Sequence, residues 1–103
     1  MGLLDFFGLG TNDNMVQEYK DKGAVILDVR TPQEYRSGHI QGSKNIPLDQ
    51  VDRKINDIKK LGKPVITCCA SGMRSGTVAG KLNHAGIEAI NGGGWTSLAR
   101  KLG

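Results

Sequence analysis

Residues 64–75 are Pro-Val-Ile-Thr-Cys-Cys-Ala-Ser-Gly-Met-Arg-Ser, and they contain the strongest structural signal in this chain. The segment 64–68 is apolar and β-branched, which is typical of a buried strand in a parallel sheet. We expect residues 69–74 to form a tight loop around Gly72, and residues 75–85 to form a helix. A strand, a loop and a helix in this order make one unit of an α/β fold.

The rest of the chain repeats this alternation of strands and helices. Short apolar runs bounded by glycine or proline predict strands, and apolar residues at helical spacing predict helices. The alternation predicts an α/β fold, with a parallel central sheet of four to five short strands and helices on both faces. The further strands are expected over residues 24–29, 45–47 and 87–90, and the further helices over residues 15–22, 32–37, 50–60 and 95–102.

Several of the expected helices have recognisable ends. Residues 31–34, Thr-Pro-Gln-Glu, form a capping box with proline at the first helical position, and Gly38 ends this short helix. Asn14 and Asp49 are expected to cap the helices that follow them. The three glycines 92–94 are expected to form a turn before the last helix.

The chain length fits a single domain. Its 103 residues leave room for one hydrophobic core. We predict a domain over residues 14–103, preceded by an N-terminal segment over residues 1–13 that is loosely ordered. Residues 1–10 are apolar, but they are few and have no basic region. We therefore expect neither a signal peptide nor a membrane span, and no membrane partner.

The two cysteines, Cys68 and Cys69, are adjacent. Neighbouring cysteines rarely form a disulfide with each other, so we expect free thiols in a reducing compartment and a cytoplasmic location. Cys68 should point to the opposite face of its strand from Cys69 and pack in the core, with a resolving thiol as the alternative role. His39 and His84 match no metal-ligand spacing, so neither a metal nor a cofactor is expected.

The net charge of +4 is unevenly placed along the chain. Residues 1–58 contain seven basic and nine acidic side chains, whereas residues 59–103 contain seven basic side chains and a single acidic one, Glu88. A positive half attracts anions. Because no array of basic and aromatic residues accompanies this charge, a small anionic substrate is expected and a nucleic acid is not.

Cys69 lies where parallel α/β folds bind their ligands, beyond the carboxyl end of a strand. The small residues that follow let the loop curl, so that its backbone N–H groups and the next helix N-terminus face the same place. Together with the charge of Arg74, these groups favour an anion and should lower the pKa of the Cys69 thiol. The alternative is that Cys69 is an ordinary buried side chain and Arg74 a solvated surface charge.

Two motifs together resemble one known family. Residues 27–47 are LDVRTPQEYRSGHIQGSKNIP and residues 69–75 are CASGMRS. In this order and at this separation they resemble the rhodanese homology domain, the second segment being similar to its active-site loop. With the closing Gly-Gly turn, the resemblance extends over nearly the whole chain from about residue 14.

The resemblance implies a sulfurtransferase. In that family the loop cysteine takes a sulfane sulfur from thiosulfate or a similar donor, forms a persulfide and passes the outer sulfur to cyanide or a thiol. It implies that Cys69 is the catalytic nucleophile. We interpret Asp28 and Arg30 mainly as a structural ion pair, Glu34 as a helix cap and His39 as a hydrogen-bonded turn residue, with a role toward the substrate as the alternative for each. The implied substrate-binding residues are Ala70, Ser71, Gly72, Met73, Arg74 and Ser75. The implied partners are a small anionic sulfur donor and a thiol or cyanide acceptor, which can be a protein.

Loop size separates this resemblance from related phosphatases and arsenate reductases. Those enzymes place five residues between the cysteine and the arginine, whereas four separate Cys69 from Arg74 here. The smaller ring favours sulfur transfer over the binding of a phosphate ester. Two other functions remain open: a module that carries a persulfide or senses an anion without turnover, and a redox protein that uses both Cys68 and Cys69.

Three departures from the family pattern accompany the resemblance. Cys68 stands where an aromatic residue is common, and the loop has no second cation, since positions 70 and 73 are Ala and Met. Leu98 takes the place of a common tryptophan, and Trp95 lies nearer the turn. We expect the last helix to be repacked as a result, with the function retained.

Overall fold

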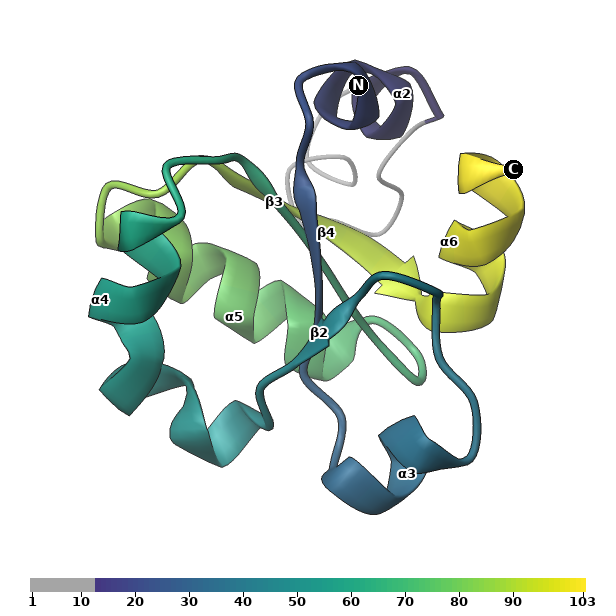
Figure 1. The fold of residues 1–103 in the computed structure, drawn as a ribbon, viewed down its shortest axis with the longest axis horizontal. Coiled ribbons are helices and arrows are strands. Elements are labelled where there is room, and N and C mark those ends of the chain that lie inside the picture. The colour runs from purple at the N-terminus through teal and green to yellow at the C-terminus, as the bar shows by residue number, and fades with distance from the viewer. Residues whose placement is uncertain (1–12) are drawn as a thin grey trace.

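The computed structural model describes residues 13–103 (Figure 1). The predicted N-terminal segment lies outside the described residues, except for Asp13, which begins the first described helix. The strands are β1 (Val25–Asp28), β2 (Lys44–Asn45), β3 (Val65–Cys69) and β4 (Ala89–Gly94). The helices are α2 (Asp13–Asp21), α3 (Pro32–Arg36), α4 (Val51–Lys60), α5 (Met73–His84) and α6 (Trp95–Leu102), and a 3₁₀ turn η1 (Leu48–Gln50) precedes α4.

The four strands form one parallel sheet in the order β2-β1-β3-β4. Helices α4 and α5 lie on one side of the sheet, and α2 and α6 lie on the other (Figure 1). This arrangement confirms the predicted α/β fold. Strand β3 is central and all five of its residues are buried, which explains why its sequence is a continuous apolar run.

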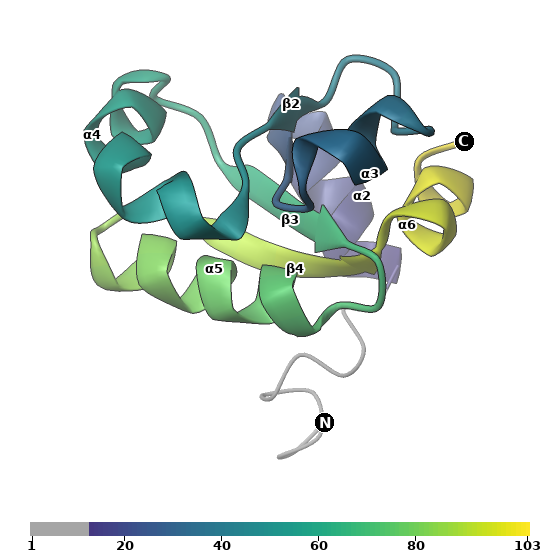
Figure 2. The same cartoon turned by 90° about the horizontal axis from the view of Figure 1, so that it is seen from below.

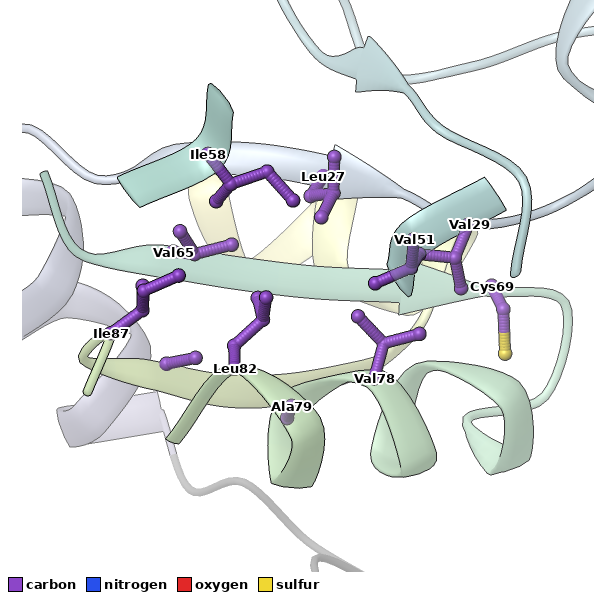
Figure 3. Packing of buried hydrophobic residues seen from close by; sticks show 11 residues of the cluster. Leu27, Val29, Val51, Ile58, Val65, Cys69, Val78, Ala79, Leu82 and Ile87 are labelled. Carbon is purple, nitrogen blue, oxygen red and sulfur yellow. The ribbon is translucent and has the colours of Figure 1, made fainter. Parts of the chain in front are cut away.

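Alternate residues of β3 point into two hydrophobic cores, one on each face of the sheet, where a single core was predicted. Val65 and Cys69 face α4 and α5, where they pack with Leu27, Val51, Ile58, Val78 and Leu82 (Figure 3). Ile66 and Cys68 face α2 and α6, where they pack with Val16, Tyr19, Ile90 and Leu98. The period of two along a strand therefore places the two adjacent cysteines on opposite faces of the sheet, as the sequence predicts.

Several predicted caps and element boundaries were wrong. Asn14 lies inside α2, which already begins at Asp13. Asp49 does not cap α4, because the 3₁₀ turn η1 intervenes and α4 begins at Val51 without a side-chain cap. Helix α5 begins at Met73, two residues earlier than predicted, and Cys69 is the last residue of β3.

A further error concerns the three glycines 92–94, which continue β4 where a turn was expected. Cys69 pairs with Gly94 across a register shift between Thr67 and Cys69. A Cβ atom at Gly92 would lie 2.7 Å from both the Ile66 side chain and the Thr67 carbonyl oxygen. Glycine is therefore needed here because β4 approaches β3 too closely for any side chain.

Candidate functional site

The site lies where β3 ends and α5 begins. The chain leaves the end of β3, turns in a tight loop and enters α5 (Figure 2). Cys69 is the last residue of the strand, and its sulfur points toward the first turn of α5 (Figure 3). Its exposed fraction is 0%, so the loop and its neighbours cover the sulfur completely.

Three hydrogen-bond donors surround the Cys69 sulfur. The backbone N–H of Gly72 lies 3.0 Å from Sγ, and the backbone N–H and the hydroxyl of Ser75 each lie 3.4 Å from it. Gly72 adopts a φ of +104°, a conformation that side chains other than glycine rarely take. This glycine turns the chain so that the amides of the loop face the sulfur, as the small residues of the loop predict.

The surroundings lower the pKa of the Cys69 thiol. Burial on its own would raise this pKa, but the Ser75 hydroxyl and the backbone amides of Ser75, Gly72 and Ser71 outweigh it by stabilising the thiolate. Cys68 has the opposite environment, because burial and then the nearby charge of Asp28 raise its pKa to about 12. The two adjacent thiols therefore differ widely in their readiness to ionise.

Arg74 makes a bidentate ion pair that the sequence analysis missed. Its Nη1 donates to Glu34 Oε1 over 2.8 Å, and its Nη2 donates to Glu34 Oε2 over 3.1 Å. The hydrogen bonds from Arg74, and then the backbone N–H of Thr31, lower the pKa of Glu34 to about 2. The positive charge of Arg74, which was expected to attract an anion to the loop, is thus paired with a carboxylate from α3. The reason is that Glu34 closes the predicted capping box and faces Arg74 at the same time.

Asp28 and Arg30 form the expected ion pair, and it is buried. Arg30 Nη2 donates to Asp28 Oδ2 over 2.7 Å and to the Gly38 carbonyl over 2.7 Å, and its Nη1 donates to the Glu34 carbonyl over 3.2 Å. Its guanidinium lies 4.8 Å from the ring centroid of Trp95. Arg30 therefore holds the backbone of α3, and through it the carboxylate that pairs with Arg74.

Asn91 is a second residue that the sequence analysis missed. It lies in β4 opposite Thr67, next to the strand that carries Cys69. Its Nδ2 donates to the carbonyl of Gly72, and its Oδ1 accepts from the Ser75 hydroxyl. The signal that could have revealed it is an amide side chain between the apolar Ile90 and the glycines, directly after the strand predicted over residues 87–90.

The remaining predicted residues are the exposed residues of the loop and His39. Ala70 and Ser71 are exposed, and Met73 is the most exposed large apolar residue described, at 81%. His39 stacks on the Tyr35 ring, and its Nδ1 bonds the Tyr35 carbonyl over 2.8 Å. Over residues 13–103, no three His, Cys, Asp or Glu side chains gather in a way that could hold a metal ion. Nor does that part of the chain contain a helix long and apolar enough to cross a membrane.

Comparison with known proteins places this geometry in a family. The family model described as the rhodanese-like domain matches residues 11–101. This chain belongs to the rhodanese-like family. The family includes sulfurtransferases, which agrees with an ionisable cysteine at the head of an amide-lined loop.

Three similar proteins illustrate the range of this rhodanese-like family. The uncharacterized protein YqhL of Bacillus subtilis is 42% identical over 67 residues, which are 65% of this chain and 52% of YqhL. Thiosulfate sulfurtransferase PspE of Escherichia coli is 33% identical over 75 residues, which are 71% of this chain and 72% of PspE. The solved structure of a rhodanese with anions from E. coli is 32% identical with a TM-score of 0.65, covering 72% of this chain and 89% of that one. The chain thus spans about half of YqhL and most of the other two proteins.

Proposed function

We propose that this rhodanese-like domain is a sulfurtransferase in which Cys69 accepts a sulfane sulfur from thiosulfate or a similar anionic donor. The observation that supports the proposal best is the set of donors at Cys69 Sγ, above all the amide of Gly72 at 3.0 Å. These donors lower the pKa of the thiol and leave a nucleophile at the carboxyl end of β3. The residues proposed to bind the donor are those that follow Cys69 in the loop, Ala70 to Ser75.

The loading step is a displacement on sulfur. The Cys69 thiolate attacks the outer sulfur of thiosulfate, the sulfur–sulfur bond of thiosulfate breaks, and sulfite leaves with the electron pair of that bond. The product is the Cys69 persulfide, whose outer sulfur carries the negative charge. The loop amides that stabilise the thiolate are placed to stabilise this anion as well. Since Cys69 is fully buried, the exposed loop residues must shift to admit the donor.

The discharge step returns the thiolate. A thiolate acceptor or cyanide attacks the outer sulfur, the persulfide bond breaks, and Cys69 leaves as a thiolate with the electron pair. A leaving group with a lowered pKa leaves faster. A cavity of about 520 Å³ lies beside Arg74 between α5 and η1. Cys69 does not line it, so a thiol acceptor that binds there, including a protein side chain, reaches the sulfur only when the loop shifts. Cys68 and Cys69 are both free thiols, which is typical of proteins in a reducing compartment. We therefore propose a cytoplasmic location.

A second candidate is a module that carries a persulfide to a partner without turning over thiosulfate. Arg74 is the one cation between Cys69 and Ser75, and its guanidinium is already paired with Glu34. When the positive charge of the loop is compensated, a doubly charged donor such as thiosulfate loses more of its attraction to the loop than a singly charged persulfide does. This observation favours loading by a persulfide or polysulfide.

Intact-mass measurement after incubation with thiosulfate tests the proposal. The native chain and Cys68→Ala are expected to gain the mass of one sulfur atom, and Cys69→Ser is expected to gain none. Cys68→Ala is the matched control, since it removes the neighbouring thiol on the other face of β3. If the native chain gains mass from a polysulfide but not from thiosulfate, the carrier module is favoured. If Cys69→Ser also gains the sulfur, Cys69 is not the acceptor and both candidates fail.

A further inference from the structure

The Ser75 hydroxyl has one proton and two acceptors within reach. The side chain of Ser75 is fully buried, and its Oγ lies 2.7 Å from Asn91 Oδ1 and 3.4 Å from Cys69 Sγ. A separation of 2.7 Å is the usual length of a good O–H···O hydrogen bond. An amide oxygen carries no proton, so Ser75 must be the donor in this short contact. The hydroxyl therefore points to Asn91 while Cys69 is a neutral thiol.

Backbone groups on both sides fix the orientation of the Asn91 amide. The N–H of Gly93 donates to Oδ1 over 2.9 Å, and Nδ2 donates to the Gly72 carbonyl over 3.0 Å. Rotating the amide by half a turn would set N–H against N–H and oxygen against oxygen. A Cβ atom at position 76 would lie 3.1 Å from Nδ2, so Gly76 leaves the room that this orientation needs.

We propose that Asn91 is a positioning residue, which holds the Ser75 hydroxyl away from the Cys69 sulfur and so limits how strongly that hydroxyl stabilises the thiolate. The inference rests on the proposed function in taking Cys69 as the reacting sulfur. In the neutral state an oxygen lone pair of Ser75 faces the thiol, which can donate its S–H to it. When Cys69 loses its proton to solvent, Ser75 can donate to the sulfur only by giving up its bond to Asn91.

Such a limit matters because sulfur transfer makes opposite demands on the same sulfur. A strongly stabilised thiolate is a poorer nucleophile toward the donor but a better leaving group toward the acceptor. With its proton held by Asn91, Ser75 leaves the thiolate reactive for loading. Discharge regenerates the same thiolate, which the competition between Asn91 and the sulfur for the Ser75 proton keeps only partly stabilised. Asn91 thus balances the two half-reactions through Ser75.

A double-mutant cycle on the titration of Cys69 tests this role. Leucine has nearly the shape of asparagine but no acceptor, so Asn91→Leu releases the Ser75 hydroxyl. We expect Asn91→Leu to lower the midpoint of thiolate formation, followed by far-ultraviolet absorbance, by about one pH unit, the size of one charge-assisted hydrogen bond. In a Ser75→Ala background the same substitution is expected to leave the midpoint unchanged. A shift that persists without Ser75 would show a general distortion of the loop and overturn the proposal, as would no shift at all.

The titration isolates Cys69 from its neighbours. Cys68 does not interfere, because burial raises its pKa to about 12. The charged groups on the elements packed around Cys69 stay in place in all variants: Arg74 with Glu34, Asp28 with Arg30, and Asp52 with Lys81. If circular dichroism shows that Asn91→Leu does not fold, Asn91→Asp replaces it. Its carboxylate is a stronger acceptor of the same size, so an upward shift that shrinks in the Ser75→Ala background is expected, and an unchanged or lower midpoint overturns the proposal. No sulfur donor takes part, so this result is independent of the mass experiment.

Discussion

Cys68 and Cys69 share a peptide bond but have opposite chemistry, because consecutive side chains of a strand point to opposite faces. Cys68 lies among Val16, Ile66 and Leu98, where no donor of the loop can reach it. Cys69 meets the amides of Gly72 and Ser75. A dithiol mechanism would need both sulfurs on one face, so the separation favours a single reactive thiol.

Iodoacetamide is therefore expected to label one cysteine of the folded protein at neutral pH. The thiolate is the reacting form, and the pKa of Cys69 lies below the ordinary value whereas that of Cys68 is about 12. Cys69 becomes accessible when the loop shifts, but Cys68 is reached only when the core opens. Peptide mapping after partial labelling should find Cys69 modified at least about a hundredfold faster. Similar rates at the two positions would contradict the assignment of Cys69 as the ionised thiol.

The pairing of Glu34 with Arg74 predicts how stability depends on pH. The pKa of Glu34 falls from 4.5 to about 2 in the folded chain, so its contribution to stability is present above pH 4.5 and is lost as the pH falls toward 2. Both side chains are about one-third exposed, which limits this contribution to about 1 kcal/mol or less. Chemical denaturation at several pH values should show the loss in the native chain.

Glu34→Gln is the matched variant for that experiment. It keeps the size of the side chain but cannot ionise, so the part of the pH dependence between 4.5 and 2 that Glu34 causes should disappear. Lys22 and Glu88 form a separate exposed ion pair and serve as an internal reference, because Glu88→Gln should leave the Glu34 part unchanged. If Glu34→Gln loses stability on acidification as steeply as the native chain, another carboxyl group is responsible.

The element that matters most is the unit β3, loop and α5. Its strand and helix could be predicted because a buried run and a helical pattern are local signals. The start of α5 could not, since the helix begins directly after Gly72, whose φ of +104° has no signature beyond the glycine itself. The glycines 92–94 were mistaken for a turn because the close approach of β4 to β3 is a contact between distant segments.

Two glycine substitutions distinguish the effect of a backbone change in the loop from that of a change in the helix. Gly72→Ala places a side chain at a left-handed φ and 3.3 Å from the Gly93 Cα, so we expect a loss of about 1–3 kcal/mol in the free energy of unfolding and a slower sulfur transfer. Gly80→Ala is the control, because it lies inside α5 with nothing within 4 Å of its Cβ position. It should stabilise the chain by about 0.5–1 kcal/mol and leave transfer unchanged. Equal effects of the two substitutions would mean that the conformation of Gly72 is not required.

On the scale of the whole molecule, the site depends on side chains that join distant segments. The parallel sheet with helices on both faces followed from the alternation of elements, so the fold class could be predicted, whereas the strand order and the two hydrophobic clusters are seen only in the structure. Two contacts at the site could not be predicted from the sequence: that of Asn91 with Gly72 and that of Glu34 with Arg74. Each joins residues that are far apart in the sequence and of types common on surfaces. Cys69 could be proposed from local pattern and family resemblance, whereas the side chains that contact its loop are seen only in the fold.

Arg30 is the clearest case of a side chain that connects distant segments. It links Asp28 at the end of β1, the carbonyls of Glu34 and Gly38, and the ring of Trp95 at the start of α6. Arg30→Met would leave the fully buried carboxylate of Asp28 without its partner, which typically costs about 3–5 kcal/mol. Domains of this kind are stable by about 5–15 kcal/mol, so the melting temperature should fall sharply. The double variant Asp28→Asn with Arg30→Met removes both charges and should lose markedly less. A double variant that is as unstable as Arg30→Met would show that the links of Arg30 to α3 and α6, rather than the unpaired charge of Asp28, determine its contribution.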